Sequence, residues 1–162
     1  MNEKAGKKAP FKGQKPERSL ARLGAVQALY QMDIGGADTN NVLAEFELHQ
    51  LQAQDNEPLG EADVPFFREI VLGVVKYQKE IDPQVNNHLA KGWRLNRLDS
   101  TLRAILRAGT YELGWRPDVP VRVVLDEYIE LAHDFFPEEE SKVVNGVLDA
   151  LAREMRAQEL SA

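Results

Sequence analysis

The residues of this chain best suited to bind a charged ligand are the lysines and arginines near its start. Residues 1–22 contain seven basic and two acidic side chains, whereas the rest of the chain contains 13 basic and 24 acidic ones. Lysine and arginine contact phosphate groups, which gives affinity for nucleic acid without reading its sequence. A basic arm on an acidic body therefore predicts an anionic partner. The candidate contacts of the arm are Lys8, Lys12, Lys15, Arg18 and Arg22.

The arm is predicted to have two parts. Arg18 and Arg22 are four residues apart, so they share one face of a helix. Residues 1–17 are rich in lysine, with glycine and proline among them. Such a segment buries too little apolar surface to fold alone, and it is predicted to be a disordered tail. The tail either meets the anionic partner or only favours solubility, and its composition leaves both readings open.

Aromatic side chains are the second kind of candidate, because unpaired RNA bases stack on aromatic rings. Tyr30 is a candidate platform, although its place at the end of an apolar stripe also fits a core aromatic. Phe135 ends another apolar stripe and is expected in the core. Phe136 falls off that stripe, so it is expected to be exposed and to be the better platform.

Catalytic patterns are missing from the sequence. His49, His88 and His133 are scattered, with no His-x-x-x-His pair that would suggest a metal site on a helix. There is no Gly-x-Ser-x-Gly elbow, no Walker lysine loop and no glycine-rich dinucleotide turn. The chain has no cysteine, which excludes a thiolate zinc site and a cysteine nucleophile. We therefore predict a protein that is not an enzyme and that uses no cofactor and no metal.

Composition favours one folded domain that follows the tail. The chain is 43% hydrophobic and 28% charged, with a formal net charge of −6, which is ordinary for a globular protein. No apolar run approaches the roughly 20 residues that span a bilayer, and no apolar segment of a secretory signal follows the basic start. The absence of cysteine fits a reducing compartment, so we predict a cytoplasmic protein with no membrane contact.

Helical spacing of apolar residues runs through the whole folded part, and no segment alternates like a strand. The first helix is expected from Arg18 to the glycines at 35 and 36, and a second from a Thr39 cap to about residue 54. A third begins near Asp63, and a fourth opens at Asp82 and Pro83. Three more are expected at about residues 100–113, 120–135 and 138–155. The fold class is therefore all-α, with about seven helices.

Several segments together resemble the NusB family of transcription antitermination factors. Their order and spacing cover roughly residues 18–152, nearly the whole folded part. The segments are Arg18-Ser-Leu-Ala-Arg22, Ala25-Val-Gln-Ala-Leu-Tyr30, Phe67-Arg-Glu-Ile, Leu72-Gly-Val, Leu106-Arg-Ala-Gly-Thr-Tyr-Glu-Leu113, Asp118-Val-Pro120, Glu130-Leu-Ala132 and Val144-Asn-Gly-Val-Leu-Asp149.

The resemblance implies both an architecture and a function. It implies one domain at residues 18–158, with an N-terminal helical subdomain at about 18–80 and a C-terminal one at about 82–158. It implies binding of boxA-type single-stranded RNA together with the ribosomal protein NusE. This pair would join elongating RNA polymerase and other Nus factors, and would suppress premature termination in ribosomal RNA operons.

The family's site residues transfer only in part. Arg18, Arg22 and Tyr30 match the first helix, and Lys142 and Asn145 match the start of the last helix near the RNA side. The family's usual phenylalanine before Val-Asn-Gly is Val143 here. Its usual Lys-x-Phe-Gly loop is replaced by residues 133–136, so local RNA contacts there are expected to differ.

Two other functions remain open from the sequence. Certain ribosomal-RNA cytosine methyltransferases carry a NusB-like N-terminal domain, so the chain could be such a domain detached from its enzyme. It could also be a helical module that binds only proteins, with the basic arm as a solubility tail.

Overall fold

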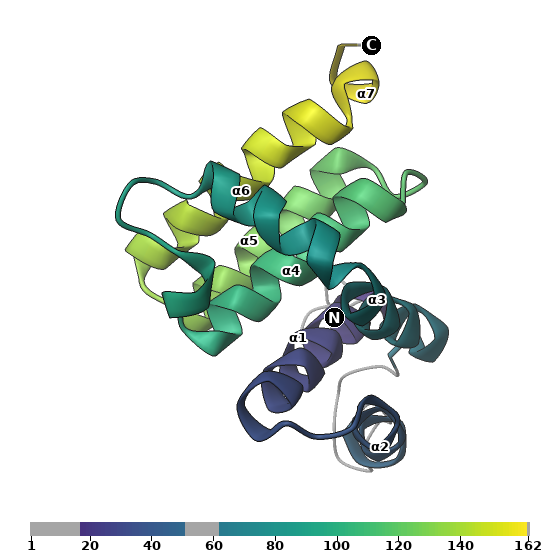
Figure 1. The fold of residues 1–162 in the computed structure, drawn as a ribbon. Helices are drawn as coiled ribbons and strands as arrows, with labels where there is room; N and C mark the ends of the chain where they lie inside the picture. The colour runs from purple at the N-terminus through teal and green to yellow at the C-terminus, as the bar shows by residue number, and fades with distance from the viewer. Residues whose placement is uncertain (1–16, 51–61, 162) are drawn as a thin grey trace, which may run out of the picture. The chain divides into compact units, whose positions relative to one another are not determined.

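The computed structural model describes residues 17–50 and 62–161, and within these ranges every regular element is a helix. Seven are α-helices, which confirms the all-α prediction (Figure 1). The chain divides into two compact units, Met1–Glu69 and Ile70–Ala162. This division falls inside a helix, α3 (Val64–His88).

The described part of the N-terminal unit consists of α1 (Glu17–Gly35), α2 (Thr39–Glu45), the π-helix η1 (Phe46–Gln50) and the first turns of α3. Small side chains line the buried face of α1, and larger ones face them from the other elements. The rings of Phe46 and Phe67 stack with their centroids 5.9 Å apart. The buried apolar residues are Ala21, Ala25, Val26, Ala28, Leu29, Val42, Leu43, Phe46, Ala62, Phe66 and Phe67.

The ends of these helices follow from local chemistry. Gly36 adopts a φ of 65°, a left-handed conformation that costs glycine little, and its N–H bonds to the carbonyl of Met32 at 3.0 Å. The cap of α2 is Asp38, whose carboxylate accepts the N–H groups of Asn40 and Asn41 at 3.1 and 3.3 Å. The prediction of a Thr39 cap was therefore one residue late, because the aspartate carboxylate reaches both free amides.

The third and fourth predicted helices lie on either side of a kink within α3. The backbone is non-helical at Tyr77 (φ −106°, ψ 16°), so the axis kinks there rather than at Pro83. Asp82 does not cap a helix: its two carboxylate oxygens accept hydrogen bonds from Nε and Nη2 of Arg107, both at 2.9 Å. The second helix of α3 therefore begins after Tyr77 and not at Asp82 as predicted, and the Asp82 carboxylate pairs with a side chain instead of free amides.

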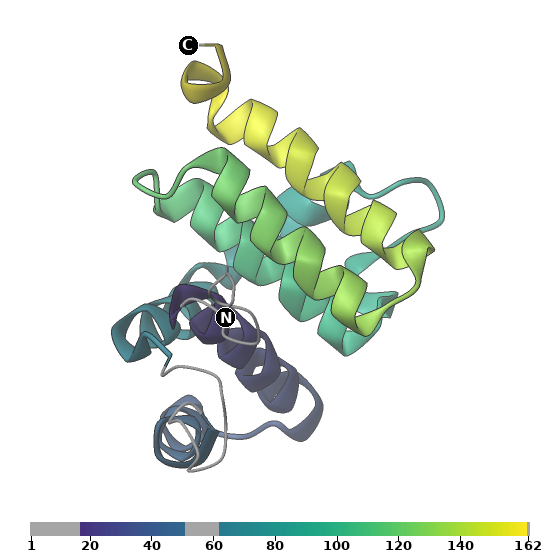
Figure 2. The same cartoon turned by 180° about the vertical axis from the view of Figure 1, so that it is seen from behind.

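The C-terminal unit is built around α4 (Ser100–Trp115), α5 (Val121–Phe135) and α6 (Glu138–Met155), which pack against one another (Figure 2). Asp99 caps α4, accepting the N–H of Thr101 at 2.7 Å. Gly109 lies inside α4 where a Cβ would approach Leu148 Cδ1 to 2.8 Å. Close packing of α4 against α6 therefore explains a glycine in the middle of a helix.

A short helix that the sequence did not predict, α7 (Ala157–Ser161), follows α6. The buried side chain of Arg156 holds the junction, donating to the carbonyls of Leu113 and Arg116, both at 2.7 Å. Glu159 accepts the N–H of Val121 at 2.8 Å and pairs with Arg156 at 2.6 Å. The Val121 hydrogen bond, followed by the Arg156 partner, lowers the pKa of Glu159.

Candidate nucleic-acid interface

The predicted arginine pair lies at the start of α1, on the ring of Phe66 from the first turns of α3. The guanidinium carbons of Arg18 and Arg22 are 4.4 and 5.0 Å from the ring centroid. A cation over an aromatic face is attracted by the ring's negative face. Phe66 therefore sets the positions of both guanidinium groups.

The two arginines differ in exposure. Arg22 is only 2% exposed, so its charge lies inside the N-terminal unit. The side chain of Arg18 is 46% exposed, and its Nε lies 3.5 Å from Oδ2 of Asp63. Arg18 is therefore the member of the pair that a ligand reaches directly.

Asp63 belongs to this site although the sequence analysis assigned it only to a helix start. Its Oδ1 accepts the N–H of Phe66 at 3.0 Å, which caps α3, and its own N–H bonds to the carbonyl of Glu17 at 3.1 Å. The carboxylate thus faces Arg18 from a position held by backbone hydrogen bonds. The sequence signal that could have indicated this role is an aspartate three residues before an aromatic residue at a predicted helix start.

Tyr30 lies farther along α1 and is 37% exposed, so it is not the core aromatic that the alternative reading expected. Twelve residues separate it from Arg18, which is about 18 Å along a helix axis. Tyr30 remains a predicted platform for a base.

The two phenylalanines at the end of α5 are reversed relative to the prediction. Phe135 is 42% exposed, whereas Phe136 is half-buried and ends the helix, its N–H bonding to the carbonyl of Ala132 at 2.8 Å. The buried apolar stripe of α5 ends at Ala132, and Phe135 is the last residue of the helix. The rings are 6.4 Å apart, and the exposed one is Phe135.

Lys142 and Asn145 are both exposed on α6. They are three residues apart, so they lie on one face of that helix. Asn145 also lines a groove of about 420 Å³ with Arg122, Leu125 and Ile129 of α5. Lys8, Lys12 and Lys15 lie outside the described residues.

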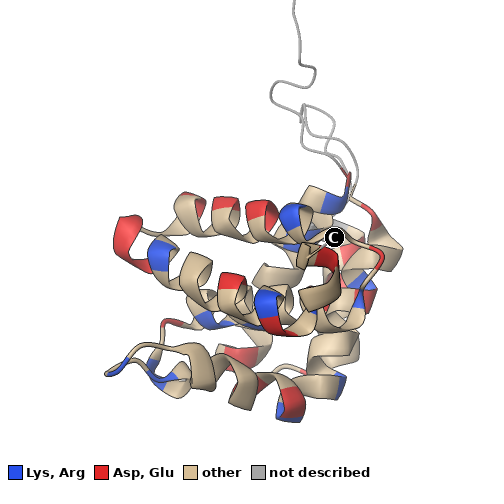
Figure 3. Cartoon of the chain, turned by 90° about the horizontal axis from the view of Figure 1, so that it is seen from above, with Lys and Arg blue, Asp and Glu red and all other residues tan. Residues whose placement is uncertain are grey.

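The first turn of α6 contains Glu138, Glu139 and Glu140. Negative side chains are stabilised there by the positive N-terminal end of the helix dipole. Basic and acidic residues are otherwise interspersed along the helices (Figure 3). Among the described residues no group of three or more metal-binding side chains could hold an ion, and no helix is long and apolar enough to cross a membrane.

The fold and the candidate residues define an all-helical protein with possible binding residues in each of its two units. The N-terminal unit offers cationic and aromatic side chains, and the C-terminal unit offers cationic, amide and aromatic ones. Comparison with known families agrees with this class. The model of the NusB family matches residues 19–153, which is most of the chain. This chain belongs to the NusB family.

Curated relatives share about half of their residues with the chain. A protein of Rhodopseudomonas palustris (strain TIE-1), named transcription antitermination protein NusB, is 49% identical over 172 residues, covering 99% of this chain and 97% of its own. A protein of the same name from Allorhizobium ampelinum (strain S4) is 55% identical, covering 86% of this chain and 88% of its own.

Solved structures share the fold. The structure of T. maritima NusB aligns with a TM-score of 0.74 at 28% identity, covering 92% of this chain and 99% of its own. A second structure holds the antitermination factors NusB and NusE in complex with double-stranded RNA, and it aligns with a TM-score of 0.71 at 26% identity. That alignment covers 84% of this chain and 96% of its own.

Proposed function

We propose that this chain is an RNA-binding transcription antitermination factor that acts in the cytoplasm. It recognises boxA-type RNA together with the ribosomal protein NusE, and it suppresses premature termination in ribosomal RNA operons. In this role it joins elongating RNA polymerase and other Nus factors.

The observation that carries the proposal is the exposed guanidinium of Arg18, set on Phe66 at the start of α1 in a NusB-family chain. A guanidinium offers donors in a planar fork that matches phosphate oxygens. The relatives named antitermination proteins are regulatory proteins of similar length, which favours this function over a detached methyltransferase domain.

The test is a titration of boxA-type RNA and of a scrambled RNA, each with and without NusE. We expect the boxA-type RNA to bind more tightly than the scrambled one, and NusE to increase that difference. Arg18→Gln should weaken binding and reduce the salt slope by about 0.7, the value for one phosphate contact on a single strand.

Arg68→Gln is the matched control, because Arg68 is an exposed arginine of the same unit that pairs with Glu47 at 2.6 Å. Equal binding of the boxA-type and scrambled RNAs, with and without NusE, would contradict the proposal. An unchanged affinity in Arg18→Gln would instead remove this arginine from the interface.

A further inference from the structure

The loop between α3 and α4 presents a cluster of exposed cations. Lys91, Arg94 and Arg97 are exposed within seven consecutive residues. Among the described residues, none of the three side chains has a hydrogen bond or an ion pair. No described carboxylate neutralises these three charges by an ion pair, so they can attract an anionic ligand.

Side chains of α3 and α4 hold the backbone of this loop in place by hydrogen bonds. Arg103 of α4 donates from Nη1 to the carbonyls of Leu95 and Leu98, both at 3.1 Å, and Asn86 accepts the N–H of Leu95 at 2.9 Å. Gly92 turns the chain with a φ of 93°. This fixed turn is the 3₁₀ helix η2 (Leu95–Arg97). Arg94 precedes its first residue and Arg97 is its last, so both side chains extend from a backbone that is held in place.

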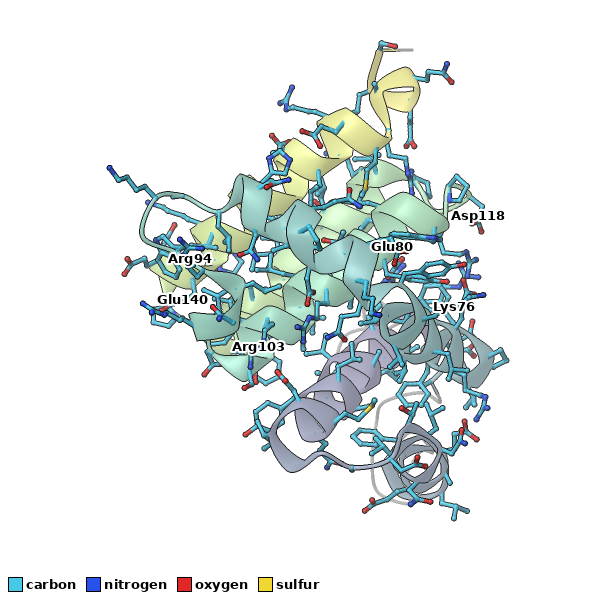
Figure 4. The ribbon with its side chains drawn as sticks, in the orientation of Figure 1. Lys76, Glu80, Arg94, Arg103, Asp118 and Glu140 are labelled. Atoms are coloured by element: carbon cyan, nitrogen blue, oxygen red, sulfur yellow. The ribbon has the colours of Figure 1, made fainter. Side chains whose placement is uncertain are left out.

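The same loop contains an aromatic ring beside a pocket. Trp93 is half-buried and lines a pocket of about 140 Å³ together with Arg94, Arg97, Leu102 and Glu140. Arg94, Arg103 and Glu140 gather at one end of the C-terminal unit (Figure 4). An indole ring next to guanidinium groups is the combination that holds unpaired nucleotides, by stacking the base and contacting the phosphates.

The two carboxylates at the pocket are tied to helix starts. Asp99 accepts the N–H groups of Thr101 and Leu102, and Glu140 belongs to the first turn of α6. Two arginines and two carboxylates line the pocket. The loop itself, residues 91–98, contains three cations and no acidic residue, so the loop is the part that attracts an anion.

We propose that Trp93, Arg94 and Arg97 form a second RNA subsite, in which Trp93 stacks on one unpaired base and the two arginines contact the adjoining phosphates. This inference rests on the proposed RNA function and adds a subsite to it. The subsite lies in the C-terminal unit, whereas Arg18 lies in the N-terminal one.

Tryptophan fluorescence tests the subsite directly, because the chain has two tryptophans. Trp115 stacks on Tyr77 at 4.7 Å, so Trp115→Phe keeps an aromatic ring there and leaves Trp93 as the reporter. We expect a boxA-type RNA with unpaired flanks on both sides to quench this reporter. The reciprocal Trp93→Phe protein, with Trp115 alone, should respond much less.

Affinity measurements supply the second readout. Arg94→Gln with Arg97→Gln should weaken binding of the flanked RNA about tenfold, within the range known for single-strand contacts, and should abolish the quenching. Lys79→Gln with Arg153→Gln is the charge-matched control on exposed positions of the same unit.

The inference fails if Trp93 is not quenched at RNA concentrations that saturate the protein, or if the control loses as much affinity as the loop variant. A response of Trp93 to polyglutamate but not to RNA would also overturn it, in favour of an acidic protein partner. The proposed function is judged separately, by the difference between boxA-type and scrambled RNA, whereas the subsite is judged by quenching with either sequence.

Discussion

Asp63 uses its two carboxylate oxygens for different purposes. Oδ1 accepts the N–H of Phe66 and caps α3, while Oδ2 lies 3.5 Å from Nε of Arg18. An RNA phosphate that binds Arg18 must compete with this carboxylate. The residue that sets the start of α3 therefore also lowers the affinity of the arginine for an anion.

Replacing Asp63 with asparagine separates these two effects. The amide oxygen still accepts the Phe66 N–H, because asparagine caps helices about as well as aspartate, while the negative charge beside Arg18 is removed. We expect Asp63→Asn to tighten RNA binding by up to about fivefold, since a partly exposed ion pair is worth about 0–1 kcal/mol. A filter-binding titration at fixed salt measures this change.

Asp38→Asn is the control for this variant, because Asp38 caps α2 in the same unit with the same chemistry. It removes the same charge from a helix start where, within residues 17–50 and 62–161, no arginine pairs with the carboxylate. If both variants tighten binding equally, net charge rather than release of Arg18 explains the effect.

At the scale of elements, the contact between α4 and α6 depends on Gly109. A Cβ at this position would lie 2.8 Å from Leu148 Cδ1 and 3.4 Å from Tyr128 Cδ2. Tyr128 is itself fixed, because its hydroxyl donates to Glu112 Oε2 at 2.5 Å inside the unit. Helices α4, α5 and α6 thus meet where α4 has no side chain.

Gly109→Ala should lower the stability of the protein by about 1–3 kcal/mol, the range for inserting a methyl group into a packed core. Thermal unfolding followed by circular dichroism measures the loss. Gly146→Ala is the matched control: Gly146 lies inside α6, and a Cβ there would meet nothing within 4 Å. That variant should be neutral or gain up to about 1 kcal/mol from helix propensity, and a similar loss in both would contradict the packing argument.

The attachment of α7 depends on the ionised form of Glu159, whose pKa is lowered mainly by the hydrogen bond from the Val121 N–H. A lowered pKa in the folded state means that the contact is complete above the ordinary value of 4.5 and is lost as the pH falls through the folded-state pKa. The NMR shift of the Val121 amide proton should therefore titrate with a midpoint below 4.5. Glu159→Gln should remove this transition, and a midpoint at or above the ordinary value would refute the contact.

At the scale of the whole molecule, charge is divided unevenly along the chain. Residues 1–16 contain five lysines and one acidic residue, while the chain as a whole has a net charge of −6. An acidic protein repels RNA at long range. Local cationic segments must therefore supply the attraction that the rest of the molecule opposes.

Deleting residues 1–16 tests whether the lysines take part. We expect weaker RNA binding and a salt slope reduced by about 0.7 for each lysine that contacts a phosphate. Affinity and slope unchanged by the deletion would mean that the segment only favours solubility. Sedimentation of the shortened chain at working concentration controls for aggregation.

The sequence by itself determined the helical class, most helix boundaries and the family. Helix periodicity is a local signal, and so is a glycine, proline or aspartate at a helix end. The observed helices end or begin at such residues, as at Gly36, Asp99 and Pro120. The resemblance carried by short motifs such as Val144-Asn-Gly-Val-Leu-Asp149 was confirmed by the family match over residues 19–153.

Only the tertiary structure decided how individual side chains are used. It placed Arg22 in the interior and Arg18 at the surface, though their spacing on α1 made them equivalent in sequence. It placed the break between the third and fourth predicted helices at Tyr77, paired Asp82 with Arg107, and exposed Phe135 instead of Phe136. Burial and pairing depend on residues distant in the chain, such as Phe66 for the arginines, and no local pattern encodes which distant partner a side chain meets.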